Sequence, residues 1–493
     1  MRKGRGDYIA GRFVRARSAD EFVSEDPGDT KHPVGVYYAA HAHVAAAVAA
    51  ACAAGPGWAA RTQDERVAAL RRIREQIARR ADELALTIVR ETGRPLWEAR
   101  QEVATMQAKV DVTVGEALAE IAERRPAGLA GRLLYRPLGV VAVVSPFNFP
   151  GHLPHGQLLP ALAAGCTVVV KPSELTPAVG ELYAEILDQA ELPRGVFGLV
   201  QGGPAIGQAL VTHADVAAVF FIGSFRTGQR IRAATSGQAD KLLALEMGGK
   251  NAALVLDDAD VELAAHEIAR SAYITAGQRC SATTRVVATR RVFGPLERRL
   301  AELARALRVG YGLDDDVFMG PLVSARARAR FLRAVRRAEK AGTAEPIVPA
   351  APRKLARPGY YVGPSLHRVT RLDPASEYQR EELFGPNLAL YAVDDLEQAL
   401  ARANDSEYGL CMSVFTQSRA AYEDVLARGR AGVVNWNRGT VGSSPRLPFG
   451  GLGRSGNHHP AGLFAIRACV RPVATLEGAG PLPDLPGLPP LTR

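Results

Sequence analysis

Cysteine is scarce in this chain, and long apolar runs are absent. Only five of the 493 residues are cysteine, and no two of them have the spacing of a metal-binding or redox pair. Sparse, unpaired cysteines exclude a disulfide-stabilised secreted scaffold and fit a reducing compartment. No apolar run reaches about 18 residues, and the polar N-terminus lacks the apolar stretch of a signal peptide. We therefore expect a cytoplasmic protein without a membrane span.

Aromatic residues make up 6% of the chain, and no stretch interleaves them with basic residues. There are nevertheless 61 Lys and Arg against 51 Asp and Glu, which gives a net charge of +10. The arginines are scattered over helix-like stretches such as 71–74 and 326–333, as on solvated helix faces. This spread argues against nucleic-acid binding, which needs a basic stripe. A basic surface also suits an anionic substrate or dinucleotide.

Strands and helices alternate from residue 138 onward. Apolar, largely β-branched runs separated by helix-like segments lie at 140–144, 166–171, 196–201, 217–222 and 241–246. This alternation predicts a parallel, Rossmann-like sheet with right-handed crossovers. Strands of a second α/β unit are expected at 252–256, 284–288, 386–393, 410–416 and 431–436. The chain is long enough for roughly two to four domains.

The chain before residue 138 is mainly helical in its pattern. The alanine-rich residues 39–54 predict a helix, and residues 62–91 predict another from apolar residues near helical spacing. A further helix is expected over about 97–123. The sequence Thr62-Gln-Asp-Glu65 has the form of a capping box. Residues 126–138 read as a hairpin-like pair of short strands.

Cys280 is the candidate for chemistry in the second unit. It follows the turn Gly277-Gln278-Arg279 and has two interpretations, a buried core thiol or a nucleophile. Two candidate partners favour the nucleophile. Glu246 ends a strand-like run, where burial would raise the pKa of its carboxyl group and suit it to base work. Asn148 lies between two aromatics and two prolines and could donate to an oxyanion. Glu246 could instead only cap the turn that follows it, and Asn148 could be an ordinary asparagine in a turn.

Seven short motifs occur in the order of one known family. They are Pro146-Phe147-Asn148-Phe149-Pro150, Lys171-Pro172-Ser173-Glu174, Phe221-Ile222-Gly223-Ser224, Leu245-Glu246-Met247-Gly248-Gly249-Lys250-Asn251, Gly277-Gln278-Arg279-Cys280, Glu382-Leu383-Phe384-Gly385-Pro386 and Pro448-Phe449-Gly450-Gly451. Together they resemble the aldehyde dehydrogenase superfamily over most of the chain. The resemblance implies an α/β fold with a Rossmann-like NAD-binding domain (1–119 and 138–248), an α/β catalytic domain (249–469), a small β oligomerisation element (120–137 and 470–480) and an irregular tail (481–493). It also implies a homodimer or homotetramer.

A dinucleotide site is expected where the strand 217–222 ends. A pyrophosphate needs the N–H groups of a helix N-terminus, which the family's looser glycine pattern would supply through Gly223, Ser224 and Gly228. The perfect Gly-x-Gly-x-x-Gly at 451–456 lacks the strand–turn–helix context and is not expected to bind phosphate. By resemblance, the NAD site also includes Lys171, Glu174, Gly248, Glu382 and Phe384. A carboxylate at the ribose repels a 2′-phosphate, which favours NAD over NADP.

The resemblance implies oxidation of an aldehyde to a carboxylic acid. Cys280 would add to the carbonyl group, Asn148 would stabilise the oxyanion, and Glu246 would activate water to hydrolyse the thioester. Relatives that transfer the acyl group to coenzyme A lack this glutamate, so hydrolysis is expected. Further motifs resemble one branch of the family, which acts in arginine breakdown on a semialdehyde with two carboxylates. Three arginines are candidate ligands for these carboxylates: Arg438, Arg446 and Arg279.

Two alternatives stay open from the sequence. The substrate could be another semialdehyde or an aliphatic aldehyde. The chain could also be a catalytically silent NAD-binding protein on the same fold, although the presence of Cys280, Glu246 and Asn148 together speaks against that.

No metal site is expected from the histidines. Pro154 and the flanking glycines disfavour a helical pair of His152 and His155. No carboxylate lies beside His458 or His459, so these four side chains do not suggest a ligand set. The expected partner is a small-molecule aldehyde, with no nucleic acid and no membrane.

Overall fold

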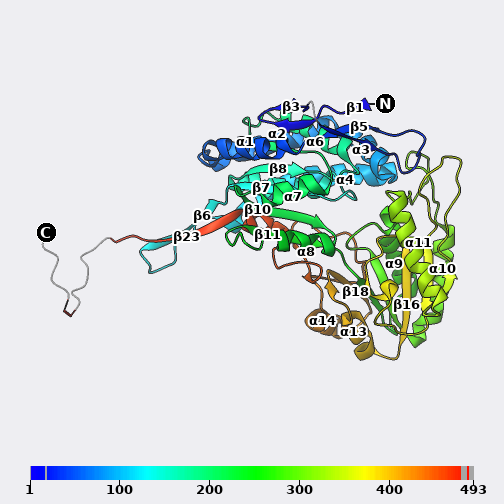
Figure 1. Cartoon of the computed structure of the whole chain (residues 1–493). Helices are drawn as coiled ribbons and strands as arrows, with labels where there is room; N and C mark the ends of the chain where they lie inside the picture. The colour runs from blue at the N-terminus through cyan, green and yellow to red at the C-terminus, as the bar shows by residue number, and fades with distance from the viewer. Residues whose placement is uncertain (1, 17–18, 479–485, 488–493) are drawn as a thin grey trace.

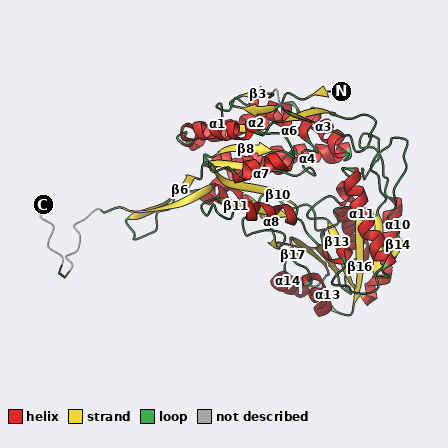
Figure 2. Cartoon of the chain, in the orientation of Figure 1, coloured by secondary structure: helices red, strands yellow, loops and turns green. Residues whose placement is uncertain are grey.

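The computed structural model describes residues 2–16, 19–478 and 486–487. Two α/β units, each built on a seven-stranded sheet, lie side by side, and a two-stranded ribbon projects from the first (Figure 1). Helices flank the strands of both sheets (Figure 2). The predicted α/β class, with a Rossmann-like unit and a second α/β unit, is confirmed. The predicted domain boundaries stay a prediction, and the tail 481–493 falls almost wholly outside the described residues.

The N-terminal part is mainly helical. Its helices are α1 (Ala42–Ala59), α2 (Gln63–Arg79), α3 (Ala81–Thr92) and α4 (Leu96–Gly115). The capping box opens α2: the Glu65 N–H donates to Thr62 Oγ1 at 3.2 Å, and the Thr62 N–H donates to Glu65 Oε2 at 2.7 Å. The prediction of one helix over 62–91 is wrong, because the backbone leaves the helical region at Arg80, with φ −110° and ψ 22°.

The first sheet contains the five parallel strands of the alternating region. Its order is β11 (Leu242–Met247), β10 (Val216–Gly223), β7 (Val140–Val144), β8 (Thr167–Lys171), β9 (Phe197–Leu199), β2 (Asp7–Ile9) and β3 (Arg12–Val14), the last two antiparallel. The chain runs outward from β7 to β9 and then returns to the other side of β7 for β10 and β11. Where strand order reverses in this way, a crevice opens at the carboxyl ends of the strands, and ligands bind there.

Helices cover both faces of this sheet. They are α5 (His152–Ala164), α6 (Pro177–Gln189), α7 (Pro204–Thr212) and α8 (Phe225–Ala234), together with α1 and α2. Strand β7 shows the division: Val141 and Val143 pack in one core with α2, α5 and α6, whereas Val140 and Ala142 pack in another with α1 and α7. Because both faces are buried, the strand is a continuous apolar run.

The second sheet is also mainly parallel. Its order is β14 (Ala344–Val348), β15 (Ser365–Val369), β16 (Asn387–Val393), β13 (Thr283–Thr289), β12 (Asn251–Val255), β18 (Cys411–Phe415) and β19 (Val433–Trp436), and only β14 runs antiparallel to its neighbour. Its helices are α9 (Val261–Tyr273), α10 (Arg290–Ala306), α11 (Ala325–Lys340), α12 (Glu377–Arg380), α13 (Leu396–Asn404) and α14 (Arg419–Arg428). Strands β14 and β15 carry proline, histidine and charged residues, so the apolar pattern did not predict them.

Several short elements complete the fold. They are the three-stranded sheet of β1 (Arg2–Lys3), β5 (Gly35–Ala39) and β4 (Asp20–Ser24), the pairs β17 (Tyr408–Gly409) with β21 (Leu452–Gly453) and β20 (Pro448–Phe449) with β22 (Ala461–Gly462), and the 3₁₀ turns η1 (Ala117–Ile121), η2 (Ile274–Gly277) and η3 (Leu463–Cys469). The β17–β21 and β20–β22 pairs and η2 lie near Cys280 and Glu246 and help to shape the site described below.

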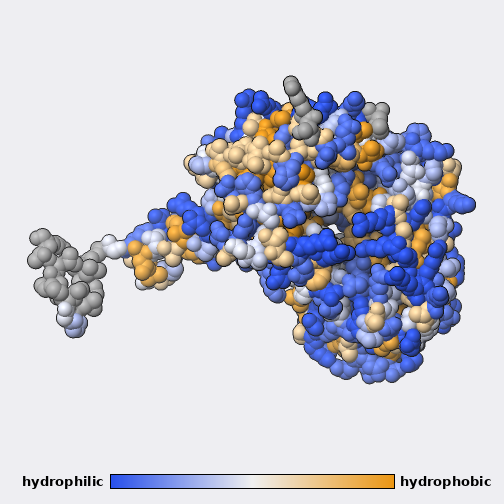
Figure 3. Space-filling model, in the orientation of Figure 1, coloured by the Kyte–Doolittle hydropathy of each residue, from blue (hydrophilic) through white to orange (hydrophobic). Residues whose placement is uncertain are grey.

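The projecting ribbon consists of β6 (Gly131–Pro137) and β23 (Val470–Leu476), paired antiparallel along their full length. The prediction of a hairpin within 126–138 is wrong, because the partner of β6 comes from the far end of the chain. Hydrophobic residues lie on the visible face of the ribbon (Figure 3). Leu129 and Leu476 are 52% and 76% exposed, which favours an interface there. The role of the ribbon in oligomerisation stays a prediction.

Helix α1 is the one described helix that is long and apolar enough to cross a membrane by length and composition. A core helix passes the same test. Val44, Val48 and Trp58 of α1 are buried against the sheet, and the Trp58 indole N–H donates to Leu162 O at 3.1 Å. The helix also contains Pro56. The length and composition of α1 are therefore weak support for a span.

Candidate active site

A cavity of about 300 Å³ is lined by residues of both units. Cys280, Glu246 and Asn148 all line it. Asn148 comes from the loop after β7, Glu246 from the end of β11, and Cys280 from the loop before β13. The structure therefore brings the three predicted chemical groups together, next to the crevice at the carboxyl ends of the first sheet.

Cys280 follows a strained turn. Thr275, Ala276 and Gly277 have φ angles of 56°, 52° and 67°, and two consecutive non-glycine residues in the left-handed region are costly. Glu98 holds this turn, since its Oε2 accepts from the Thr275 N–H at 3.2 Å and its Oε1 accepts from the Thr275 hydroxyl. Such strain persists where the surroundings fix a functional side chain, here the Cys280 thiol.

The carbonyl group of Cys280 is fixed from the opposite side. Asn251 Nδ2 donates to the carbonyl oxygens of Cys280 at 2.7 Å and Ala282 at 2.8 Å. A Cβ added at Gly249 would lie 2.5 Å from the same Cys280 oxygen, so only glycine fits there. Gly249 and Asn251, which belong to the same motif as Glu246, thus hold the loop that carries Cys280.

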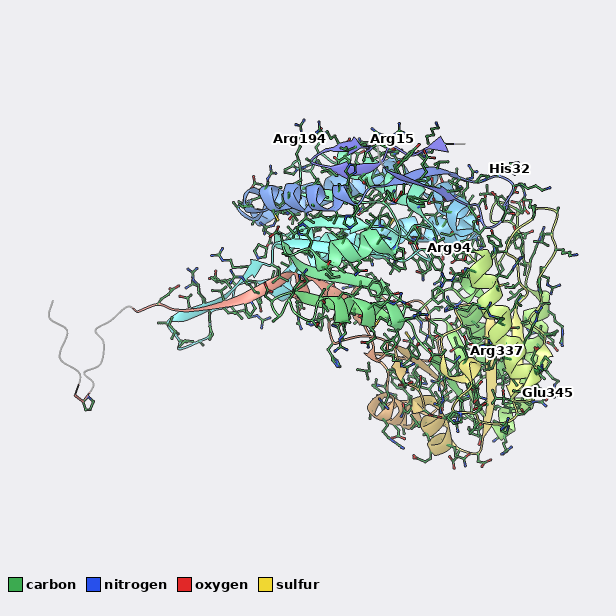
Figure 4. All side chains as sticks on the ribbon, in the orientation of Figure 1. Arg15, His32, Arg94, Arg194, Arg337 and Glu345 are labelled. Carbon is green, nitrogen blue, oxygen red and sulfur yellow. The ribbon has the colours of Figure 1, made fainter. Side chains whose placement is uncertain are left out.

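A buried ion-pair network connects α4 with this loop. Arg279 donates to Glu98 Oε1 at 3.0 Å and to Thr275 Oγ1 at 2.7 Å. Arg94 donates to Glu102 and stays within 3.8 Å of Glu98. Arg94 lies on the side of the first unit that faces the second (Figure 4). The network therefore joins the two units directly behind the cavity.

Phe149 lies between two cations of this network. The guanidinium groups of Arg94 and Arg279 lie 4.6 Å and 4.8 Å from the centre of its ring. This contact fixes the backbone next to Asn148, whose Nδ2 donates to Gln278 O at 2.9 Å. An amide nitrogen carries two hydrogens, so one N–H of Asn148 is left for an oxyanion in the cavity.

Glu246 carries an unpaired carboxyl oxygen. Its Oε2 is buried and has no hydrogen-bond partner in the described part of the chain. Burial raises the pKa of Glu246 well above its ordinary value of 4.5. A raised pKa makes the ionised carboxylate a stronger base near neutral pH. Asn457 holds the strand, since its Oδ1 accepts from the Leu245 N–H at 2.9 Å and its Nδ2 donates to Leu243 O at 2.7 Å.

The Gly-x-Gly-x-x-Gly sequence at 451–456 forms β21 and a turn, and no α-helix follows it among the described residues. Ser455 O accepts from the Met247 N–H at 2.9 Å, and Ser455 Oγ donates to Gly248 O at 2.7 Å. This glycine loop therefore clamps the end of β11, where Glu246 lies, and offers no helix N-terminus to a phosphate.

The surroundings of Cys280 favour the neutral thiol in the ligand-free protein. Burial, together with the carboxyl groups of Glu382 and Glu246 and against the opposing effect of Arg279, raises its pKa to about 12. We therefore expect the neutral thiol to be the resting form. The proton must leave when substrate binds or when positive charge arrives beside the thiol.

The expected pyrophosphate site lies at the end of β10. The strand ends at Gly223, and Ser224 caps α8 by accepting from the Thr227 N–H at 3.3 Å. A Cβ added at Gly228 would lie 2.5 Å from Met247 Sδ, so glycine lets α8 pack closely on β11. The ten-residue helix α8 thus presents its N-terminus at the crevice beside β7, as a phosphate requires.

Lys171 is the last residue of β8, and Glu174 follows it, at the same carboxyl end of the sheet. Lys171 is buried, and its Nζ donates to Pro172 O at 2.8 Å and lies 3.5 Å from Glu174 Oε2. The Glu174 side chain is 44% exposed, so its carboxylate is accessible to a ribose. Their predicted contacts with adenosine stay a prediction.

Glu382, Gly248 and Phe384 gather next to the reactive loop. The Gly249 N–H donates to Glu382 Oε1 at 3.0 Å, and a Cβ added at Gly248 would lie 2.1 Å from Glu382 Oε2. Burial raises the pKa of Glu382 to about 7. Phe384 has φ +55° and packs edge-to-face on Phe147, with ring centres 5.8 Å apart. These groups stay the predicted site of the nicotinamide half.

The sequence model of the Aldehyde dehydrogenase family matches residues 13–473. The chain belongs to the aldehyde dehydrogenase family. It is 41% identical over 475 residues to a Chromobacterium violaceum protein named N-succinylglutamate 5-semialdehyde dehydrogenase, covering 95% of this chain and 96% of that protein. Its fold is similar to 1-pyrroline-5-carboxylate dehydrogenase from Thermus with bound NAD, at 30% identity and a TM-score of 0.90 over 96% of this chain and 92% of that one. It is equally similar to lactaldehyde dehydrogenase from Escherichia coli, at 32% identity and a TM-score of 0.90 over 96% and 99%.

Only one of the three arginines expected to bind substrate lines the cavity of this aldehyde dehydrogenase, namely Arg279. Arg446 is exposed and pairs with Glu116 at 2.8 Å, and Arg438 is exposed in the loop after β19. The sequence placed both arginines near the thiol but could not give the direction of their side chains. Two other cations line the cavity: Lys109 and Arg270.

The expectation that Pro154 excludes a helical pair of His152 and His155 is wrong. Both histidines lie in α5, because proline is tolerated in the first turn of a helix, where the N–H groups have no intrahelical partner. The ring of His155 bonds to the Tyr183 hydroxyl at 2.6 Å and to Met106 O at 2.9 Å. Burial lowers the pKa of His155 to about 3, as for a neutral core histidine.

Glu98 and Glu102 of α4 line the candidate site and were missed by the sequence interpretation. Glu98 and Glu102 are 1% and 3% exposed, and they hold the Cys280 turn and the start of α5 respectively. A signal was present, since acidic residues four apart lie on the same face as the apolar Val103 and Met106. Buried carboxylates need charged or N–H partners, which Arg94 and the backbone supply.

The state of the thiol can be tested by alkylation. We expect the rate of iodoacetamide modification of Cys280 in the ligand-free aldehyde dehydrogenase to rise about tenfold per pH unit between about pH 7 and 10. Only the thiolate reacts, and its fraction grows in this way at every pH below a pKa of about 12. Mass spectrometry of the Cys280 peptide gives the rate. A plateau near neutral pH would show that the thiolate is the resting form.

Proposed function

We propose that this aldehyde dehydrogenase converts aldehydes to carboxylic acids by NAD-linked oxidation and hydrolysis, with Cys280, Asn148 and Glu246 as its catalytic residues. The observation that carries the proposal is the meeting of a thiol, an amide donor and a carboxyl group in one cavity, from three separate elements. A catalytically silent protein on the same fold would not need the strained turn of Thr275, Ala276 and Gly277 just before Cys280.

The geometry supports a sequence of covalent steps. The Cys280 sulfur adds to the aldehyde carbon and releases its proton to solvent water, while an Asn148 N–H donates to the carbonyl oxygen as negative charge develops there. NAD, when bound, supplies the hydride acceptor that converts the thiohemiacetal to a thioester. Glu246 then takes a proton from water as the water attacks the thioester, which releases the carboxylic acid and restores the thiol.

The residues at the crevice fit a dinucleotide. The N-terminus of α8 offers free N–H groups and Ser224 to the pyrophosphate, with the exposed Arg226 in the first turn. Lys171 and Glu174 would hold the adenosine ribose, where the carboxylate disfavours a 2′-phosphate. The solved Thermus relative is described with bound NAD. We therefore propose NAD rather than NADP.

We propose N-succinylglutamate 5-semialdehyde as the substrate. Relatives about 41% identical over most of the chain carry the name of that activity. The cavity supports a substrate with carboxylates, because three cations line it: Lys109, Arg270 and Arg279. The runner-up is another semialdehyde of similar length.

A panel of aldehydes tests this assignment. The wild-type enzyme should show a kcat/KM for N-succinylglutamate 5-semialdehyde about ten- to a hundredfold above that for a neutral aldehyde of similar length, since a charge-assisted hydrogen bond contributes about 1.5–3 kcal/mol. It should also prefer NAD to NADP. Initial rates of reduced-cofactor formation give both ratios. Equal kcat/KM values across the panel would refute the dicarboxylate substrate and leave an unspecialised aldehyde dehydrogenase.

We further propose a cytoplasmic homodimer or homotetramer that is assembled through the ribbon of β6 and β23. A two-stranded sheet has exposed edges and is marginally stable alone, and exposed leucines flank this one. The five free cysteines fit a reducing compartment.

A further inference from the structure

Lys109 is a cation of the cavity without a carboxylate partner. It lies on α4, and in the described part of the chain its one hydrogen bond is a long contact from Nζ to His152 O at 3.4 Å. The nearby Glu102 is committed elsewhere, because it accepts from Arg94 and from the Gly151 and His152 N–H groups at 2.9 Å and 2.8 Å. The ammonium group is therefore free to bind an anion.

Gly156 makes the space that the ammonium group occupies. A Cβ added at Gly156 would lie 2.0 Å from Lys109 Nζ, far below any real contact. Gly156 lies inside α5, where glycine is about 1 kcal/mol less favourable than alanine. Nothing in the backbone of α5 requires glycine there, since Gly156 has no positive φ. The presence of glycine at position 156 is therefore explained by the space that it leaves for the Lys109 side chain.

The same end of the cavity holds two other polar groups without partners. His152 and Gln157 both line the cavity, and the buried atoms His152 Nδ1 and Gln157 Oε1 have no hydrogen-bond partner among the described residues. Gln157 as a whole is 4% exposed. Buried polar atoms without partners cost free energy unless a ligand or water satisfies them. They therefore mark this end as a binding surface for a polar ligand.

This end of the cavity adjoins a second space that the reactive groups do not line. Lys109 and Gly156 also line a second, smaller cavity that adjoins the first, and none of Cys280, Glu246 and Asn148 lines that one. The other cations have partners: Arg279 bonds to Glu98, and Arg270 bonds to Glu267 Oε2 at 2.9 Å. A ligand whose aldehyde lies at Cys280 would therefore place its far end beside Lys109.

We propose that Lys109, in the space left by Gly156, binds the succinyl carboxylate of the substrate, which is the carboxylate farther from the aldehyde. The inference rests on the proposed function and adds the residue that selects for the acyl group. The substrate amide N–H lies between its two carboxylates, and Gln157 Oε1 accepts from it. Burial lowers the pKa of Lys109 to about 8, so the amine is still mostly protonated at neutral pH.

Two substrates isolate this contact. N-succinylglutamate 5-semialdehyde and N-butyrylglutamate 5-semialdehyde differ only in the terminal carboxylate, which is a methyl group in the second. The Lys109→Met variant keeps the volume of the side chain and removes its charge. We expect it to lower kcat/KM for the succinyl substrate about ten- to a hundredfold and to change the butyryl value by less than about twofold. Lys340→Met is the matched control, because Lys340 is exposed at the end of α11.

Gly156→Ala provides a second variant that keeps the charge. The added methyl group displaces the flexible end of Lys109, while alanine favours the helix, so the melting temperature should stay the same or rise. We expect kcat/KM to fall for the succinyl substrate and not for the butyryl substrate, because the KM of the succinyl substrate rises. If Gly156 has only a structural role, the ratio of the kcat/KM values for the two substrates should stay unchanged.

The outcomes separate this inference from the proposed function. If the wild-type enzyme uses both substrates equally well, the dicarboxylate substrate and the role of Lys109 are both refuted. If the wild-type enzyme prefers the succinyl substrate and Lys109→Met keeps that preference in full, only the role of Lys109 is refuted. An equal loss for both substrates in Lys109→Met would assign the residue to the shape of the cavity.

Discussion

The Cys280→Ala variant should lose dehydrogenase turnover by more than about a thousandfold while it still binds NAD. In the proposed mechanism the sulfur makes the only covalent bond to the substrate, and the methyl side chain of alanine has no nucleophilic atom. The cofactor residues at the end of β10 are separate from the thiol, so dinucleotide affinity should stay within about twofold. Turnover is measured by NADH absorbance, and cofactor binding by calorimetry.

Cys52→Ala is the matched control for this variant. Cys52 is an exposed free cysteine on α1 and does not line the cavity. The control should keep the activity of the wild-type enzyme. Turnover near the wild-type rate in Cys280→Ala would refute covalent catalysis by this residue. Loss of NAD affinity together with activity would indicate that the loop, and not the thiol alone, had changed.

The first sheet could be predicted closely from the sequence. Both of its faces are buried, so its strands are continuous apolar runs between helical segments. Strand β7 (140–144) was predicted with the bounds that the structure has. The same rule failed for β14 and β15, whose sequences include Pro346, His367 and Arg368. Only β14 is an edge strand, and in both strands the proline, histidine and charged residues interrupt the apolar pattern.

Long-range pairing could not be predicted from local pattern. Strand β6 looks like half of a hairpin until its partner β23 is known. Antiparallel partners can be near to or far from each other in the sequence, so the local pattern of β6 does not show where its partner lies. The break between α2 and α3 at Arg80 is similar, since the apolar spacing continues through it. In both cases the local sequence is compatible with more than one structure, and tertiary packing determines which one forms.

The candidate site could also be predicted only in part. Motif residues placed Cys280, Glu246 and Asn148 in one cavity, because each lies at the end of an element whose position follows from the fold. The substrate side of the cavity was missed, since it depends on where side chains point. Arg446 pairs with Glu116 on the surface, whereas Lys109 reaches the cavity from the middle of a helix.

The Glu246→Gln variant should give a burst of about one NADH per site and then nearly stop. Glutamine fills the same volume but cannot take a proton from water, so hydride transfer proceeds and the thioester accumulates on Cys280. The fold should be unaffected, because Glu246 Oε2 has no hydrogen-bond partner among the described residues to lose. Stopped-flow absorbance resolves the burst, and mass spectrometry of the quenched protein detects the acyl group.

The pH dependence of the wild-type enzyme should agree with this role. Only the ionised carboxylate is a base, so the rate of thioester hydrolysis should rise with pH through the pKa of Glu246, which burial holds well above 4.5. Glu246→Gln should show no such rise. Glu75→Gln, at an exposed position of α2, is the control and should keep both the rate and its pH profile.

The burst also tests whether Glu246 acts earlier. The negative charge of Glu246 is one of the groups that raise the pKa of Cys280, so glutamine should lower that pKa and leave the first step as fast or faster. A slow or absent burst in a folded Glu246→Gln protein would therefore contradict hydrolysis as its only role. It would show instead that Glu246 takes the proton of the Cys280 thiol as the sulfur attacks the aldehyde.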